Sequence, residues 1–453
     1  AYQTDGRGRV RLMAVRGRND DGHILETTIW FYRAKDNDKW QRFSEVKNGD
    51  ADEGDQPLAI DPEKNVAYVL SAKNGFKVLY GVALDGSGAR ELVLEQAGVD
   101  IDDVIEIGRN GRVVGATYAT ERRTNAFFDP ELKKLGAALA KALPGQPLIR
   151  FVDSSQDESR LLLLASSDVD PGMFYRYDKS THHLEQVLPV REPLSNQAMG
   201  TMTAITFAAN DGTQVPAYLT LPPGSTGKGL PAIVMPHGGP GARDEWGFDW
   251  LVQYFAVRGY AVMQPNYRGS TGYGSGWYQK NGFKSWRVAI GDVNAAGQWL
   301  TAQGIAAQGK LAVVGWSYGG YAALQSGVVA PDLFKAIVAI APVTDLDRLR
   351  EQSRDFTDFN LVDAYIGHGP HIEEGSPARN AAAIRAPVLL FHGDRDLNVD
   401  ITESRLMEGR LASAGKSVTF VSFPGLDHQL AKAAARARLL ADSDAFLRKA
   451  LGL

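Results

Sequence analysis

The stretch LAVVGWSYGGYAALQSGVVA (residues 311–330) decides the fold predicted for this chain. Residues 311–315 are an apolar run typical of a buried β-strand, and residues 321–329 have a helical pattern. Between them, GWSYG (315–319) fits G-x-S-x-G, a turn from strand to helix so tight that small residues must flank the serine. A plain glycine-rich turn with an incidental serine is the simpler alternative. The strand and the helix on either side favour Ser317 as a nucleophile at a helix N-terminus.

Apolar β-type runs alternate with helical stretches in the part of the chain that follows residue 195. Continuous apolar strands that alternate with helices predict a parallel sheet with helices on both faces. A hairpin-like pair around Asn210-Asp211-Gly212 precedes them. The strand runs are residues 231–236, 260–266, 311–315, 335–341, 387–391 and 417–423, and helical patterns cover residues 290–303 and 321–329.

Before residue 195 the pattern is that of an all-β region. Short apolar runs are separated by polar turns, and a weak repeat recurs about every 46 residues, a period typical of propeller blades. A generic β-sandwich with chance spacing is the alternative. Helical periodicity is confined to a short stretch near residues 130–143. We expect an all-β, partly propeller-like domain of about four blades at residues 1–195, and an α/β domain at residues 196–453.

The composition limits the chemistry and the partners of the chain. Its 49 basic and 53 acidic residues give a formal net charge of −4, so neither nucleic acid nor an anionic membrane is expected as a partner. No apolar run approaches the roughly 18 residues that span a bilayer. The sequence contains no cysteine, which excludes disulfides, thiolate catalysis and cysteine-ligated zinc.

The visible start of the chain, AYQTDGRGR, begins with Ala1 and has no signal-peptide character. We therefore expect that a leader or a longer N-terminal portion has been removed, and the residues do not distinguish the two. The compartment stays open between a periplasmic or secreted location, which we slightly favour, and a cytoplasmic one.

A serine hydroxyl is a weak nucleophile at neutral pH, so Ser317 requires a base and an acid that orients the base. Around this motif the usual order along the chain is serine, acid, histidine. The run PVLLF (387–391) leads into HGDRD (392–396), which supplies Asp396 just past a later strand. Asp394 and Asp400 are close by, and either fits a turn or a helix cap.

The base follows by elimination. Four histidines lie after Ser317, namely His368, His371, His392 and His428. Only His428 follows Asp396, in the loop PGLDH (424–428) after a late strand. A surface loop histidine is the alternative, but this position in the chain order favours His428 as the base.

An oxyanion intermediate requires backbone donors where its charge develops. The N–H of Tyr318 is one candidate. The strand run PAIVMP ends in HGGP (237–240), whose glycines let the backbone approach a substrate closely. Gly239 is our first choice for the second donor and Gly238 the next. We interpret His237 as a structural residue that orients this loop.

The glycine-rich segment NYRGSTGYGSG (266–276) lacks the Gly-Lys-Ser/Thr of a phosphate-binding loop and does not fit a dinucleotide fingerprint. We interpret it as a shaped loop beside the site. No His-Glu-x-x-His or other metal spacing occurs, so we expect neither a metal nor a cofactor.

Taken together, these motifs resemble the prolyl oligopeptidase family of serine peptidases, and most of all its acylaminoacyl-peptidase and dipeptidyl-peptidase branches. The resemblance covers about residues 200–450. The matching motifs are HGGPGARDEWGF (237–248), NYRGSTGYG (266–274), GWSYGGY (315–321), SP (376–377), PVLLFHGDRDLNV (387–399) and GLDH (425–428).

The resemblance implies an α/β-hydrolase domain and an N-terminal propeller that limits access to short peptides. It also implies cleavage of oligopeptide bonds through an acyl-enzyme, with no cofactor. Ser317 then corresponds to the nucleophile, Asp396 to the acid and His428 to the base, with Tyr318 and the His-Gly-Gly loop as the oxyanion hole. Propellers of this family have seven or eight blades, so either blades are absent from this chain or its propeller is reduced.

Two further functions stay open beside the oligopeptidase. A carboxylesterase would use the same three residues, and a propeller-based interaction protein could carry a vestigial hydrolase domain. Tyr321, Trp246 and Phe248 could line the acyl-side pocket or belong to the core, so the substrate-binding residues are unknown. Exopeptidase or endopeptidase action is also undecided. So is the oligomeric state, although a homo-oligomer would cover the open β edges.

Overall fold

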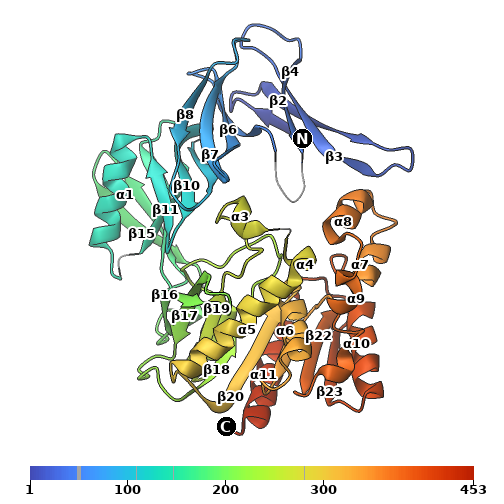
Figure 1. Cartoon of the computed structure of the whole chain (residues 1–453). Coiled ribbons are helices and arrows are strands. Elements are labelled where there is room, and N and C mark those ends of the chain that lie inside the picture. The colour runs from blue at the N-terminus through green and yellow to red at the C-terminus, as the bar shows by residue number, and fades with distance from the viewer. Residues whose placement is uncertain (48–52, 109, 146, 280) are drawn as a thin grey trace. The chain divides into compact units, whose positions relative to one another are not determined.

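The computed structural model describes residues 1–47, 53–108, 110–145, 147–279 and 281–453, and Figure 1 shows its elements. The chain forms two compact units. The first comprises residues 1–197 together with the short segments 245–248 and 272–276, and the second comprises the remainder. Each unit has its own hydrophobic cores.

The first unit contains four antiparallel sheets in chain order, of four, four, three and four strands. The first two sheets hold β1 (Tyr2–Thr4), β2 (Val10–Arg18), β3 (Ile24–Tyr32), β4 (Gln41–Lys47), β5 (Gln56–Asp61), β6 (Val66–Lys73), β7 (Phe76–Ala83) and β8 (Arg90–Leu94). The next two hold β9 (Ile101–Ile107), β10 (Arg112–Ala119), β11 (Arg123–Phe127), β12 (Leu148–Ser154), β13 (Arg160–Ser166), β14 (Met173–Asp178) and β15 (His183–Pro189), followed by a short turn of 3₁₀ helix at Glu192–Leu194. The predicted all-β region is confirmed.

Each sheet of the first unit packs against the next one through apolar side chains. One cluster joins Leu12 and Trp30 of the first sheet to Val69 of the second. Further clusters join the second sheet to the third and the third to the fourth. The predicted helix is α1 (Pro130–Ala142), which is N-capped by Asp129 and packs into the last of these clusters.

The second unit is built on an eight-stranded sheet of order β16-β17-β19-β18-β20-β21-β22-β23. The pairs β16–β17 and β17–β19 are antiparallel. All later pairs in this order, from β19–β18 to β22–β23, are parallel. The strands are β16 (Thr201–Ala208), β17 (Gln214–Leu221), β18 (Leu230–Val234), β19 (Ala261–Pro265), β20 (Ala306–Trp316), β21 (Ile337–Ile340), β22 (Val388–Gly393) and β23 (Val418–Phe423).

Helices cover both faces of this sheet (Figure 1), because successive residues of each strand face opposite sides. In β20, Leu311 and Val313 join a core with α5, α6 and α10, whereas Ala312 and Val314 join a core with α2 and α11. The helices are α2 (Trp250–Val257), α3 (Ser275–Tyr278), α4 (Asn281–Lys284), α5 (Trp286–Ala302), α6 (Tyr318–Val329), α7 (Leu346–Gln352), α8 (Phe359–Ile366), α9 (His371–Glu374), α10 (Thr402–Ser413) and α11 (Ala433–Leu451), with a 3₁₀ turn at Ala381–Ala383.

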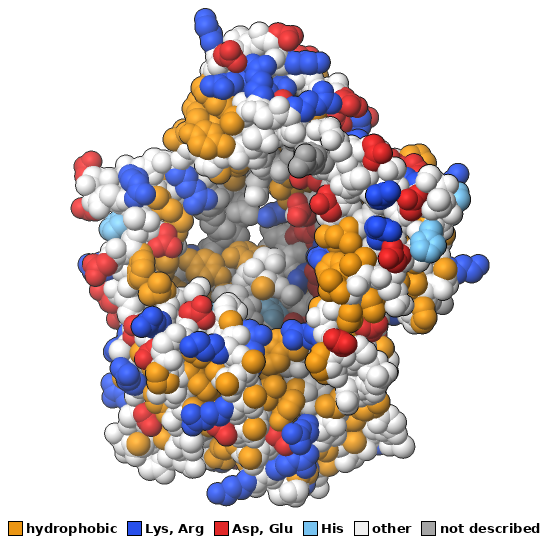
Figure 2. All heavy atoms as spheres, turned by 180° about the vertical axis from the view of Figure 1, so that it is seen from behind, with side chains coloured by type: hydrophobic (Ala, Val, Ile, Leu, Met, Phe, Trp, Pro, Cys, Tyr) orange, Lys and Arg blue, Asp and Glu red, His pale blue; other side chains and the backbone are white. Residues whose placement is uncertain are grey.

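The surface mixes both signs of charge. Basic and acidic side chains are interspersed over the face that Figure 2 shows, as the near balance of the two in the sequence would suggest. Among the described residues, no helix is both long enough and apolar enough to cross a membrane.

Candidate active site

The predicted nucleophile lies on a strained turn between β20 and α6. Ser317 is the N-cap of α6 and has φ 59° and ψ −122°, a backbone conformation that non-glycine residues rarely adopt and that costs about 1–3 kcal/mol. Its N–H donates to the carbonyl of Ile340 on β21 at 2.8 Å, and its carbonyl accepts from the N–H of Tyr321 at 3.0 Å. The turn is therefore held by both the sheet and the helix.

Glycine is required on both sides of this serine. A Cβ atom on Gly315 would lie 2.0 Å from the carbonyl oxygen of Gly319, inside the turn itself. A Cβ atom on Gly319 would lie 2.1 Å from the carbonyl oxygen of Pro236. The second contact shows that the loop after β18 packs directly on the nucleophile turn.

The His-Gly-Gly loop also lies against the serine itself. A Cβ atom on Gly238 would be 3.2 Å from the carbonyl oxygen of Trp316 and 3.5 Å from Cβ of Ser317. The N–H of Tyr318, the first residue of α6, has no acceptor within the helix, as is general for first-turn amides. The structure thus brings Gly238 to the nucleophile turn, beside Tyr318.

His237 holds this loop in place through its ring. One ring nitrogen, Nε2, is 2.8 Å from Oγ of Ser270, and Nδ1 is 2.7 Å from the carbonyl oxygen of Gly238. Tyr267 stacks on the ring and donates its hydroxyl to the carbonyl of His237 at 2.9 Å. Burial lowers the pKa of His237 to about 4, so the ring is neutral in its structural position. Tyr267 and Ser270, from the segment that follows β19, therefore support this loop.

Asp396 lies in the loop that follows β22, and its side chain is fully buried. Its Oδ1 atom accepts from the N–H groups of Asn398 and Val399, at 2.8 and 2.9 Å. Burial by itself would raise the pKa of this carboxyl, but hydrogen bonds from His392 and His428 outweigh burial and hold the pKa below its ordinary value. Asp396 is thus a buried carboxylate that stays ionised.

His428 contacts this carboxylate from the loop after β23. Its Nδ1 atom is 2.6 Å from Oδ2 of Asp396. The backbone carbonyl of His428 accepts from the indole N–H of Trp316, the residue before the serine, at 3.1 Å. A Cβ atom on Gly393 would lie 2.3 Å from the carbonyl oxygen of Leu426, so a glycine is needed where the acid and base loops meet.

The two alternative acids have other roles in the structure. Asp394 is exposed and accepts from the N–H of Gly425 at 2.5 Å, which ties its loop to the histidine loop. Asp400 is exposed and accepts from the N–H of Thr402 at 2.8 Å, at the start of α10. These are the turn and helix-cap roles that the sequence left open for them.

The residues considered for a substrate pocket lie in different surroundings. Tyr321 is wholly buried in the core of the second unit, among Phe283 and Tyr318. Trp246 is buried in the first unit beneath the guanidinium of Arg122, 3.7 Å from the ring centroid. These positions do not assign either side chain to a substrate pocket.

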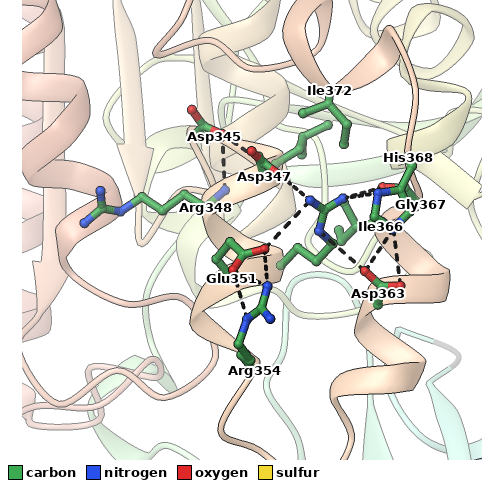
Figure 3. A network of polar contacts seen from close by, with 12 residues as sticks. Asp345, Asp347, Arg348, Glu351, Arg354, Asp363, Ile366, Gly367, His368 and Ile372 are labelled. Atoms are coloured by element: carbon green, nitrogen blue, oxygen red, sulfur yellow. Dashed lines mark hydrogen bonds and ion pairs between the residues drawn. The ribbon is translucent and has the colours of Figure 1, made fainter.

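Helices α7 and α8 follow β21 at the same edge of the sheet as the nucleophile. Figure 3 shows the polar network that joins them. Arg350 of α7 donates to the carbonyl of Gly367 at 3.2 Å and lies 3.4 Å from Asp363 of α8. At the N-terminus of α7, Oε2 of the buried Glu403 accepts from the N–H groups of Thr344 and Asp345, at 2.8 and 2.9 Å. No motif in the sequence predicts this arrangement.

Among the described residues, no three His, Cys, Asp or Glu side chains are grouped so that they could hold a metal ion.

A strained serine turn, a buried histidine–carboxylate pair and a glycine loop meet where parallel strands end, and together they define the α/β-hydrolase class of serine enzymes. Comparison with known proteins agrees with this class. Residues 246–453 match the model of the prolyl oligopeptidase family. Over these residues the chain is similar to that family of serine peptidases.

Two curated relatives show how far the similarity extends. Dipeptidyl aminopeptidase BIII of Pseudoxanthomonas mexicana is 28% identical over 457 aligned residues, which cover 97% of this chain and 65% of that protein. The acylamino-acid-releasing enzyme of Arabidopsis thaliana is 29% identical over 216 residues, which cover 45% of this chain and 28% of that protein. The chain thus spans less than two thirds of the length of each.

Solved structures share the fold over nearly the whole chain. A puromycin-hydrolyzing peptidase of Mycobacterium tuberculosis has a TM-score of 0.77 at 24% identity, with 97% of this chain and 70% of that one covered. The acylaminoacyl peptidase of Pyrococcus horikoshii has a TM-score of 0.71 at 18% identity, with 96% and 68% covered. At these identities the likeness concerns the fold.

Proposed function

We propose that this protein hydrolyses peptide bonds of oligopeptides through an acyl-enzyme formed on Ser317. The observation that carries the proposal is the contact of 2.6 Å between Nδ1 of His428 and Oδ2 of Asp396, both buried beside the nucleophile turn. The similarity of residues 246–453 to a serine peptidase family supports peptides as the substrate class.

The proposed reaction follows from these positions. Oγ of Ser317 attacks the carbonyl carbon of the scissile bond, and Nε2 of His428 takes the hydroxyl proton. Asp396 keeps the proton of the imidazole on Nδ1 and stabilises the imidazolium that forms. The N–H of Tyr318 and that of Gly239 or Gly238 donate to the oxyanion. His428 then protonates the leaving amine, and a water molecule hydrolyses the acyl-enzyme by the same steps in reverse.

We further propose that the four sheets of the first unit are blades of a propeller. Their order along the chain, their antiparallel pairing and the apolar contacts between successive sheets support this interpretation.

The first experiment is labelling with a fluorophosphonate, which reacts with an activated serine. Wild-type protein is expected to be labelled and S317A to lose labelling. S326A is the matched control, because Ser326 is a buried serine of the same helix α6 outside the site. Wild-type protein that resists labelling would contradict enzymatic function and favour an interaction protein.

A substrate panel then separates the enzyme classes. It should contain peptides with a free amino terminus, N-acylated peptides, internal-cleavage peptides and short acyl esters. The two relatives named above act, by their names, at dipeptidyl and acylated amino termini, so the first two groups are the informative ones. Hydrolysis of the esters alone would make the protein a carboxylesterase instead.

A further inference from the structure

A second buried histidine contacts the proposed acid. His392 is the next-to-last residue of β22, and its side chain has no exposed surface. Its Nε2 atom is 3.2 Å from Oδ2 of Asp396 and 2.8 Å from the carbonyl oxygen of Val399. Its Nδ1 atom is 2.7 Å from Oγ of Ser404, a buried residue of α10. The imidazole is thus held at both nitrogens.

The partners of this ring fix the position of its proton. Nε2 faces two acceptors, a carboxylate and a carbonyl, so it has to carry the N–H that both of them share. A neutral imidazole has a single N–H, so Nδ1 of His392 accepts the hydroxyl proton of Ser404. The ring therefore has one tautomer and one orientation, with its donor directed at Asp396.

Four donors surround the carboxylate of Asp396, two for each oxygen. The backbone amides of Asn398 and Val399 bind Oδ1, and the two histidines bind Oδ2. His392 is thus the only donor besides His428 described on the oxygen that faces the base. Both histidines contribute to the lowered pKa of the carboxyl, against the effect of burial.

We propose that His392 is a positioning residue for the hydrolysis, which holds Oδ2 of Asp396 in line with Nδ1–H of His428 and shares the carboxylate charge. This inference rests on the proposed function of the site. Without His392, one lone pair of a buried carboxylate has no partner. The carboxylate then becomes more basic and binds the imidazolium of His428 more strongly. It also loses one of the two contacts that hold its Oδ2 atom in the present orientation.

The test compares H392F, which removes the donor and keeps the ring size, with H392Q, whose side-chain amide can reach the position of Nε2. H392F is expected to lower kcat about 10- to 100-fold, the range for a misplaced reacting group, with KM changed less than about 2-fold. The acid limb of its pH–kcat/KM profile should move to higher pH. H392Q should restore most of kcat and return the limb toward its wild-type position.

A matched control is H371F, because His371 is a partly buried histidine of α9 that contacts the carbonyl of Ile366 outside the site. It should leave the pH limb where it is. If H392F does not fold, S404A supplies a milder change, since it removes the partner of Nδ1 and should shift the limb in the same direction by a smaller amount.

A second readout separates this inference from the proposed function. In histidine-labelled protein, the ring resonance of His428, assigned through H428N, reports its titration without any turnover. Its midpoint is expected to rise in H392F and to return in H392Q. A wild-type protein that neither reacts with the fluorophosphonate nor hydrolyses any substrate of the panel would contradict the proposed function. The NMR titration would still decide whether His392 acts on His428. A lower melting temperature in H392F with an unmoved midpoint would make His392 structural only and overturn the inference.

Discussion

Nδ1 of His428 lies 2.6 Å from Oδ2 of Asp396, and the exposed fractions of the two side chains are 9% and 0%. A charge-assisted hydrogen bond of this length, in a buried site, orients the imidazole and fixes its tautomer. We therefore expect D396N to place an amide beside Nδ1 and favour the wrong tautomer. The expected loss in kcat is about 10⁴-fold, by analogy with the same change in another serine enzyme.

The controls for D396N are the two neighbouring aspartates. D394N and D400N should each keep kcat within about 3-fold, a change of under 1 kcal/mol, because these residues bond to backbone amides away from the imidazole. Rates measured on the best peptide of the panel decide the matter. A loss at D394N or D400N as large as that at D396N would show that another acid orients the base.

The pH dependence of activity should reflect the base and not the acid. The pKa of Asp396 lies below its ordinary value, so the folded protein binds its proton less readily than the unfolded chain does. Asp396 thus stabilises the fold above the ordinary carboxyl range, and this stability is lost only as the pH falls through the lowered pKa.

Histidine changes charge between about pH 5 and 8, so kcat/KM should fall below about pH 6–7 while the protein stays folded. Circular dichroism over the same range tests this, because parallel loss of structure and rate would contradict it.

The contact of Gly238 with the nucleophile turn makes a further prediction. In G238A, the new methyl group would lie 3.2 Å from the carbonyl oxygen of Trp316, closer than an ordinary contact, so we expect a small shift of the loop away from the oxyanion. Loss of one oxyanion donor costs about 10²- to 10³-fold in kcat, and we expect a loss of this order with nearly unchanged stability. Steady-state rates and urea unfolding of the same preparation measure the two quantities.

Two further glycine variants serve as comparisons for G238A, one expected to be more disruptive and one expected to be neutral. Gly239 has φ +122° and would place a Cβ atom 2.8 Å from the backbone nitrogen of Gly241, so G239A should lose stability as well, by about 1–3 kcal/mol. Gly291 of α5 has open space around it, so G291A should keep both rate and stability. Full activity in G238A would show that the loop does not supply a donor.

The alternation of strands and helices in the second unit could be predicted from the sequence, because its strands are strong apolar runs. The proposed site residues follow such runs. Ser317 lies in a motif with a strand before it and a helix after it, and only one histidine follows Asp396. Short motifs at strand ends are local, so they can be recognised without knowledge of the packing.

Other residues of the site could not be recognised in this way. The proposed role of His392 depends on the loop after β22, which folds back so that Asp396 contacts the ring. It also depends on Ser404, which comes from a helix with a weakly apolar sequence. Glu403 occupies a polar stretch that predicts an exposed position, yet it is buried because the loop after β21 offers it three donors. Such roles arise from contacts between distant segments, which periodicity does not report.

Glu403 makes the last prediction, which concerns stability. Burial raises its pKa to about 7 from a usual 4.5. Between these values the folded protein binds more protons than the unfolded chain, so the free energy of unfolding falls as pH rises through this window. A shift of this size corresponds to up to about 3 kcal/mol. Glutamine keeps an oxygen acceptor for Thr344 and Asp345 but does not ionise, so E403Q should match wild type near pH 5 and exceed its stability by up to that amount at pH 8.

Urea unfolding of wild type and E403Q at pH 5, 6, 7 and 8 measures this difference. The matched control is E408Q, a Glu→Gln change on the same helix α10, which should keep the wild-type dependence on pH. The slope of stability against pH should be shallower in E403Q alone. If E403Q instead loses stability in parallel with wild type between pH 5 and 8, then ionisation of Glu403 is not what destabilises the second unit, and the three donors of the loop after β21 bind a carboxylate that is already charged at pH 5.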